Sequence, residues 1–112
     1  MKDFRKLLVW KKAHQLTLKV YQVTANFPRE ELYGLTTQLR RSSSSIAANL
    51  AEGCGRNSDT DFARFGVMAA GSASELEYHL LLTTKNYEEL EQSTVEVKRM
   101  LTAFIQKLKA DR

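Results

Sequence analysis

The sequence has one cysteine, one proline and no long apolar run, and each of these shortages narrows the class of protein. Cys54 has no second cysteine with which to form a disulfide inside the chain. No segment approaches the roughly 18 consecutive apolar residues that a membrane-spanning helix needs. Near the N-terminus only Leu7–Trp10 is apolar, which is shorter than the roughly 7–15 residues of a secretion signal. We therefore expect a cytoplasmic protein that does not enter a membrane.

The usual catalytic and metal-binding motifs are also missing. Di-iron bundles use Glu-x-x-His, in which the histidine follows the glutamate by three positions. Here His79 follows Glu75 by four positions, and His14 has no carboxylate nearby in the sequence. Asp59 and Asp61 lack the rest of a calcium loop, and the single cysteine has no CxxC companion. The chain contains neither a Gly-x-x-x-x-Gly-Lys phosphate loop nor a Gly-x-Ser-x-Gly elbow. We expect no enzymatic activity, no metal ion and no cofactor; a metal enzyme is the least favoured alternative.

The composition that is present suits a small globular domain. The chain has 112 residues, of which 43% are hydrophobic and 27% charged, so residues 1–112 are expected to form one domain with its own core. The 17 Lys and Arg outnumber the 13 Asp and Glu. Basic residues concentrate near both ends of the chain, whereas residues 57–91 are mainly acidic. This distribution predicts one basic surface built from the chain ends and one acidic surface built from the middle.

Apolar residues that recur at steps of three and four predict helices throughout. The first helix is expected from about Leu7 to Asn26 and is ended by Pro28, because the residue before a proline is pushed out of the helical region. It carries two neighbouring apolar stripes, which predicts contacts with two other helices. The second helix is expected to begin between residues 30 and 35 and to end at Gly53, where Gly53-Cys54-Gly55 provides a cap and a turn.

The third helix has a clear start, because Ser58 and Asp61 resemble a capping box. It is expected to run to about Asn86, followed by a short connection and an antiparallel fourth helix. The apolar seam of the fourth helix consists of Leu90, Thr94, Val97, Leu101, Phe104 and Leu108. With no strand signal, the sequence predicts an all-α fold, an antiparallel up-down-up-down four-helix bundle.

Small residues predict a close contact between the second and third helices. Ser42 and Ile46 lie on one face of the second helix, so that face mixes small polar and large apolar side chains. Two smooth patches are expected to meet: Ala47, Ala48 and Ala51 on the second helix, and Gly66, Ala69, Ala70, Gly71 and Ala73 on the third.

A set of spaced motifs resembles the four-helix-bundle family of 23S rRNA intervening-sequence proteins. The motifs are Trp10 with the lysines after it, Phe27-Pro28, Tyr33-Gly34-Leu35, Gln38-Leu39-Arg40-Arg41, Ser45-Ile46, Asn49-Leu50-Ala51-Glu52-Gly53, Arg64-Phe65, Ala70-Gly71-Ser72 and Glu75-Leu76-Glu77. They cover nearly the whole chain. One departure is Ala47, where the family often has proline, so the second helix should be less strained here.

The resemblance implies a left-handed four-helix bundle that assembles into a ring-shaped homopentamer, with no established catalytic activity. It also implies a link to nucleic acid, since a related member accompanies reverse transcriptases and is thought to bind nucleic acid through basic surfaces. The expected partners are further copies of the chain, RNA or DNA, or a nucleic-acid-processing protein. The alternative is a structural or protein-interaction scaffold that does not bind nucleic acid directly.

The candidate nucleic-acid site consists of Lys11, Lys12, Arg40 and Arg41. Adjacent helical residues point about 100° apart, so one arginine of the pair could face a partner while the other faces solvent or a neighbouring subunit. Arginine's planar fork suits phosphate, and ring assembly would multiply the charge. The alternative is a solvated pair, or a pair that forms salt bridges between subunits.

A second set of polar residues, Asn49, Glu52, Ser72 and Glu75, predicts a structural network where the second and third helices face each other. The aromatic residues follow the helix seams, with no sheet to present them to bases. Any nucleic acid is therefore expected to be recognised through its backbone and shape.

Overall fold

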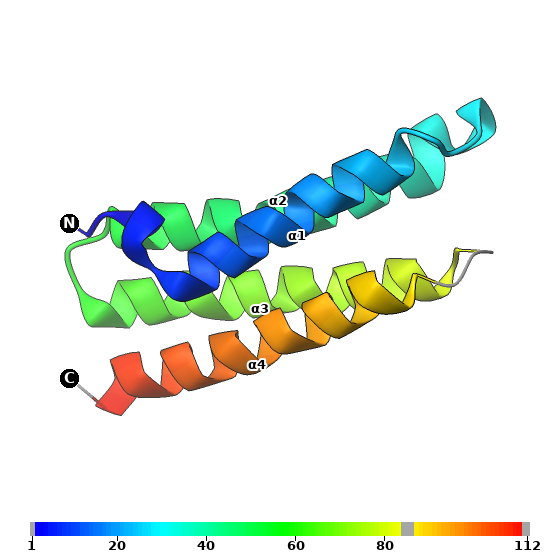
Figure 1. Ribbon diagram of the computed structural model, residues 1–112. Coiled ribbons are helices and arrows are strands. Elements are labelled where there is room, and N and C mark those ends of the chain that lie inside the picture. Colours follow the sequence, from blue (N-terminus) through cyan, green and yellow to red (C-terminus); the bar gives the residue numbers. More distant parts are fainter. Residues whose placement is uncertain (1, 84–86, 111–112) are drawn as a thin grey trace.

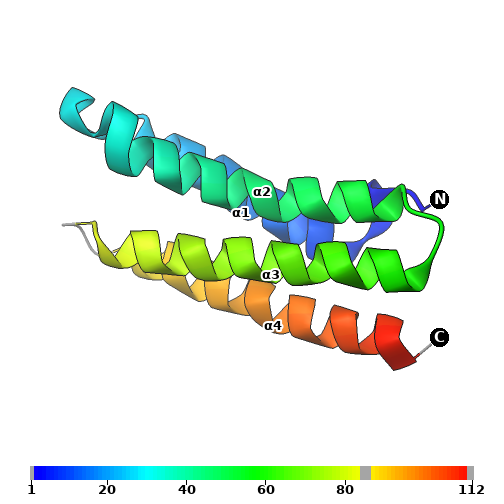
Figure 2. The same ribbon diagram turned by 180° about the vertical axis from the view of Figure 1, so that it is seen from behind.

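The computed structural model describes residues 2–83 and 87–110, and within them the chain folds into four α-helices. These are α1 (Leu8–Thr24), α2 (Thr37–Cys54), α3 (Asp59–Leu81) and α4 (Glu88–Ala110). Each helix runs antiparallel to the next, and α1 packs against α4 to close the bundle (Figures 1 and 2). The all-α up-down-up-down prediction is confirmed, and the left-handed twist stays a prediction.

The core extends along a bundle of 47 × 21 × 19 Å. Leu39, Leu50, Leu76 and Leu101 are almost completely buried in it, together with Ile46. The predicted seam of α4 is confirmed, with Phe104 half-buried and the other members buried. The two stripes of α1 face α2 and α4, which are its two neighbours, as expected. None of the helices in the described residues combines the length and the apolar character that crossing a membrane requires.

Shorter segments connect the helices. A 3-10 turn, η1 (Phe4–Lys6), precedes α1, and Asp3 caps it by accepting a hydrogen bond from the Arg5 amide. Between α1 and α2 the chain forms a 3-10 turn, η2 (Arg29–Glu31), and a π-helical turn, η3 (Leu32–Thr36). The backbone of Gly34 is not helical, so the chain is kinked between these turns and α2. They form the tip of the bundle farthest from the chain ends (Figure 1).

The predicted ends of the first and third helices need correction. The first helix ends at Thr24 rather than Asn26, because Asn26 and Phe27 donate to carbonyls three residues back and tighten the chain into a turn. The third helix ends at Leu81 rather than near Asn86, again with a bond from Leu82 to the carbonyl three residues back. The predicted end at Asn86 itself lies outside the described residues.

The second helix also differs from its prediction at both ends. Helical turns begin at Arg29, but the regular helix begins only at Thr37. It ends at Cys54, and the C-cap is Gly55 with an ordinary negative φ of −82°. Gly53 is therefore an interior residue of α2. The helix passes through Ala47 without interruption, as the absence of proline predicts.

The two predicted smooth patches meet in part, because the buried Ala47 of α2 and the buried Ala69 and Ala73 of α3 belong to one core cluster. Gly53 makes the close α2–α3 approach, because a Cβ there would lie 2.7 Å from Phe62 Cδ1. Gly66 approaches Ile105 of α4 instead of α2. Ala48 and Gly71 are exposed and contact no other helix closely. Small residues in the sequence thus mark both internal packing and an outer surface.

Candidate nucleic-acid interface

Arg40 is occupied in joining α2 to α1. Its Nε donates a hydrogen bond to the Thr24 hydroxyl at 2.8 Å, and a terminal nitrogen donates to the Tyr21 carbonyl at 3.4 Å. The guanidinium lies 4.7 Å from the centroid of the Tyr21 ring. Thr24 is buried and donates its own hydroxyl to the Val20 carbonyl. Arg40 therefore binds the last turn of α1, where the helix dipole is negative.

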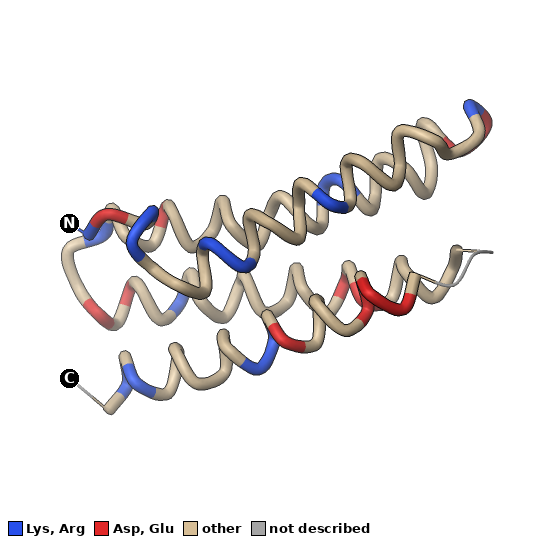
Figure 3. Tube along the Cα trace, viewed as in Figure 1, with Lys and Arg blue, Asp and Glu red and all other residues tan. Residues whose placement is uncertain are grey.

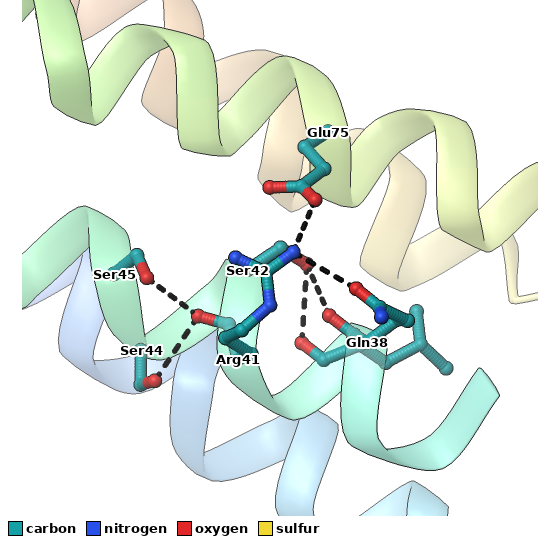
Figure 4. Close-up of polar contacts among 7 residues, drawn as sticks. Gln38, Arg41, Ser42, Ser44, Ser45 and Glu75 are labelled. Carbon is teal, nitrogen blue, oxygen red and sulfur yellow. Dashed lines mark hydrogen bonds and ion pairs between the residues drawn. The ribbon is translucent and has the colours of Figure 1, made fainter. Parts of the chain in front are cut away.

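Arg41 turns to the other side of α2 and faces α3. It forms an ion pair with Glu75 and donates a hydrogen bond to Gln38 Oε1 at 2.8 Å (Figure 4). Its backbone carbonyl accepts hydrogen bonds from the hydroxyls of Ser44 and Ser45. Neighbouring positions on the helix thus tie α2 to two different helices, so the alternative of a simple solvated pair does not describe these arginines within one chain.

The two predicted lysines lie elsewhere. Lys12 forms an ion pair with Glu96 of α4 at 3.6 Å. Lys11 is exposed and has no carboxylate partner among the described residues. The structure therefore places the four predicted residues on three edges of the bundle, those between α1 and α2, α2 and α3, and α1 and α4. They do not form one patch within a single chain.

The predicted polar network also divides into separate contacts. Asn49 donates to the Ser45 carbonyl of its own helix at 2.8 Å, and Glu52 pairs with Arg56 at 3.1 Å. Glu75 reaches across to α2, but its partner is Arg41. Ser72 is half-buried, and no hydrogen bond in the described residues joins it to the other three. A polar contact between α2 and α3 exists as expected, with a different partner.

The more coherent basic surface is the end of the bundle that holds the chain termini, as the charge distribution of the sequence predicts, but the predicted site residues included only Lys11 and Lys12 from it and missed Lys6, Lys107 and Lys109. Residues 2–14, 48–70 and 98–110 carry 11 Lys and Arg against 4 Asp and Glu. The remaining described residues carry 4 Lys and Arg against 8 Asp and Glu. Figure 3 shows this separation along the bundle. The uneven distribution of charge in the sequence was the signal, and the fold converts it into two differently charged ends.

Ion pairs neutralise some of the cations at the end that holds the chain termini and leave others unpaired. We define the basic end by its four exposed lysines that have no carboxylate partner in the described residues: Lys6, Lys11, Lys107 and Lys109. Every other lysine or arginine in residues 2–14 pairs with a carboxylate, as Lys2 does with Asp59. Unpaired surface cations keep their full charge for a ligand, whereas a paired cation must first give up its partner.

Apolar contacts hold the two chain ends together. Phe4, Leu7 and Phe104 all pack against one buried cluster, which consists of Cys54, Phe62, Ala63 and Leu108. The Lys2 amide also donates to the Cys54 carbonyl at 3.0 Å. Because of this packing, the N-terminal segment and the last turns of α4 present their lysines at the same end of the molecule.

The side chains of Cys54 and His14 lie in packing contacts. Burial raises the pKa of the Cys54 thiol, an effect that nearby Lys2 partly offsets. A protonated thiol is a poor nucleophile. His14 stacks on Trp10, with ring centroids 4.9 Å apart. Among the described residues, no three His, Cys, Asp or Glu side chains are grouped so that they could hold a metal ion.

A third surface feature is apolar and lies on the outside of α3. Val67, Gly71, Tyr78 and Leu81 are exposed at helical spacing, and we call them the α3 outer stripe. Leu81 is 67% exposed and Tyr78 is 58% exposed. Beside them a groove of about 620 Å³ runs between α3 and α4 and reaches Val95 and Arg99. Large apolar side chains exposed in a row mark contact surfaces more often than isolated ones do.

Comparisons with known proteins point to one family. The family model described as 23S rRNA-intervening sequence protein matches residues 5–103. A solved structure from Bacteroides thetaiotaomicron, described as a protein with unknown function from the S23 ribosomal protein family, has the same fold with a TM-score of 0.75. It is 24% identical, and the alignment covers 88% of this chain and 98% of that one. Among curated proteins no sequence matches.

Proposed function

The chain belongs to the 23S rRNA-intervening sequence protein family, and from this premise we propose that it is a non-catalytic cytoplasmic bundle that binds structured RNA or DNA through its basic end. The observation that supports this most is the group of unpaired lysines at that end, Lys6, Lys11, Lys107 and Lys109. Flexible lysines suit a sequence-independent grip on phosphates. The residues that the structure describes form no sheet on which bases could stack, so recognition is through backbone and shape.

The absence of catalysis is part of the proposal. Its support is the state of the one thiol, which is buried and has a raised pKa. The family resemblance, which carries no established activity, points the same way.

The first test is the salt dependence of binding. We would titrate a fluorescent RNA hairpin and a matched DNA duplex with protein at several salt concentrations and record anisotropy. Each phosphate contact on B-DNA contributes about 0.9 to the slope of log affinity against log salt. Lys107→Gln/Lys109→Gln and Lys6→Gln/Lys11→Gln should each reduce that slope by about one to two.

Arg29→Gln is the matched control, because Arg29 is exposed and has no ion-pair partner in the described residues but lies at the opposite end. It should leave the slope unchanged. An intact protein that fails to bind either nucleic acid at low salt would refute the proposal, and so would equal losses for Arg29→Gln and the lysine variants.

We also propose that the chain assembles with copies of itself, as a pentamer according to the family resemblance. The α3 outer stripe supports this, because Gly71 lets another helix approach between the exposed Val67 and Tyr78. A closed ring uses two different patches on each subunit, so the stripe would meet another surface of the neighbouring chain. The same observation favours the second candidate function, a scaffold that assembles without binding nucleic acid.

Light scattering tests the assembly. A pentamer has five times the 12.8 kDa mass of one chain. Val67→Ser or Leu81→Ser should lower the mass to that of one chain while the helical circular dichroism stays constant. Leu32→Ser, which alters an exposed leucine at the tip of the bundle, should keep the assembly intact. A single-chain mass for the unaltered protein at micromolar concentration would rule out stable assembly.

A further inference from the structure

The tip of the bundle opposite the basic end contains a pocket of about 440 Å³. It is lined by the connection that follows α1, by Leu82 and Thr83 after α3, and by Tyr87 before α4. The turns of that connection lie at the tip farthest from the chain ends (Figure 1). Its apolar lining comes from Phe27, Pro28, Leu35, Leu82 and Tyr87. The rings of Phe27 and Tyr87 stack with centroids 6.0 Å apart. This volume is large enough for one aromatic side chain.

The surroundings of the pocket are unusually apolar for a solvent-facing loop region. Leu82, which lines it, is 52% exposed. In the adjoining turns Leu32 is 41% exposed and Tyr33 is 93% exposed. An exposed tyrosine beside a pocket is typical of protein interfaces, where aromatic residues are enriched.

The charge near the pocket is mainly negative, with one exposed cation, Arg29 of η2, among the described residues. Of the carboxylates in the described residues, only Glu30, Glu31, Glu88 and Glu91 have no ion-pair partner. Glu30 and Glu31 lie in η2, and Glu31 lines the pocket, whereas Glu88 and Glu91 lie in the first turn of α4 and line the neighbouring groove between α3 and α4. The other eight form ion pairs. We call this pocket, with its four glutamates, the acidic tip.

From this combination we propose that the acidic tip docks a basic segment of another protein, which inserts one large apolar side chain into the pocket. The unpaired glutamates attract the lysines or arginines of that segment over a distance and orient it. The pocket then contributes the burial of the apolar side chain, which long-range attraction alone cannot supply. The docked partner would lie at the end of the bundle away from the lysines assigned to nucleic acid.

A second copy of this chain is the less favoured occupant. Its basic end has the right charge, but a head-to-tail contact would join unlike patches and extend into an open fibre unless it closed into a ring. Such a contact would also cover Lys6 and Lys107, which the proposed function needs for phosphate. The choice between the two occupants therefore rests in part on the proposed function, whereas the pocket and its charge do not.

The test uses the full chain and a fluorescein-labelled nonapeptide with a central tryptophan between four lysines or arginines on each side. A matched peptide has alanine in place of tryptophan. Anisotropy at low salt should show that the tryptophan peptide binds at least tenfold more tightly than the alanine peptide. Leu82→Ser and Glu31→Gln should each weaken its binding at least threefold. Glu52→Gln, an exposed carboxylate at the basic end, is the control and should leave binding unchanged.

Several results would overturn the inference. Equal binding of the two peptides would mean that the pocket accepts no apolar anchor. Equal effects of Glu31→Gln and Glu52→Gln would mean that only the general charge of the protein matters, and no binding at low salt would exclude the site. If Leu82→Ser and Lys107→Gln each abolished a concentration-dependent self-association, the occupant would be a second copy. RNA binding by the same samples reports separately on the basic end.

Discussion

Gly53 and Gly71 show how differently two glycines inside helices can contribute to this fold. A Cβ at Gly53 would lie 2.7 Å from Phe62 Cδ1 and 3.0 Å from Phe65 Cβ. A Cβ at Gly71 would have no atom from another part of the protein within 4 Å. Glycine at position 53 is therefore required by the close approach of α2 and α3, whereas no contact within the chain requires glycine at position 71, where it lowers the helix propensity.

We predict opposite effects for the two alanine substitutions. Gly53→Ala should lower the free energy of unfolding by about 1–3 kcal/mol, because the extra methyl group overpacks the contact with α3. Gly71→Ala should raise it by up to about 1 kcal/mol through helix propensity. Urea unfolding followed by circular dichroism measures both. A stabilising Gly53→Ala would show that Phe62 moves aside without cost.

The contact partners of Arg40 and Arg41 could not be predicted from the sequence around them. The prediction that residues 40 and 41 point in different directions is consistent with the structure, because Arg40 contacts Thr24 of α1 and Arg41 contacts Glu75 of α3. The identity of those partners depends on the register of three helices, which spacing within one helix does not determine. Residues spread over the chain ends, such as Lys6 and Lys107, become neighbours of the same surface only after folding.

At the scale of the elements, the turn between α2 and α3 depends on a helix cap. Ser58 has extended backbone angles, and its hydroxyl accepts a hydrogen bond from the Asp61 amide at 3.1 Å. Asp59 and Asp61 add negative charge in the first turn, where the helix dipole is positive. This is the cap that the sequence predicts for the third helix, so the prediction of that helix start is confirmed.

Removing the Ser58 cap should destabilise the protein measurably. Ser58→Ala leaves the first amides of α3 without this acceptor and should lower the free energy of unfolding by about 1 kcal/mol. Thr102→Ala on α4 is the control, because that hydroxyl is exposed and bonds only to a carbonyl of its own helix. Its effect should stay within about 0.5 kcal/mol. Equal losses in both variants would argue against a special role for the cap.

The helices and their apolar seams were predictable from the sequence because helical spacing is a local pattern. The ends of the helices were harder to predict. The Ser58 cap is a local signal, and it predicts the start of α3 correctly. The end of α3 at Leu81 depends on a backbone hydrogen bond from Leu82 to the carbonyl three residues back. No glycine or proline in the sequence marks this position as a helix end. The π-helical turn at Leu32–Thr36 likewise lacks a periodic signature. The pocket at the acidic tip combines Phe27 with Tyr87, which are distant in sequence, and was therefore not predicted.

At the scale of the whole molecule, the protein is an elongated body with oppositely charged ends. The bundle is 47 Å long, and its unpaired glutamates and the lysines of the basic end lie toward opposite ends of it. The range of electrostatic interaction is about 10 Å at 0.1 M salt and about 30 Å at 0.01 M. The acidic tip should therefore influence a nucleic acid at the basic end only when the salt concentration is low.

This leads to a prediction that combines the two ends. Glu30→Gln/Glu31→Gln should raise the affinity for the RNA hairpin about twofold or more at 0.01 M salt, since it removes repulsion of the phosphates. At 0.1 M salt the change should become too small to measure because the two ends are then screened from each other. Leu32→Ser, a change of the same tip without a change of charge, should have no effect at either concentration. An effect of equal size at both salt concentrations would instead place the RNA in direct contact with the acidic tip, and the assignment of phosphate binding to the basic end would then be wrong.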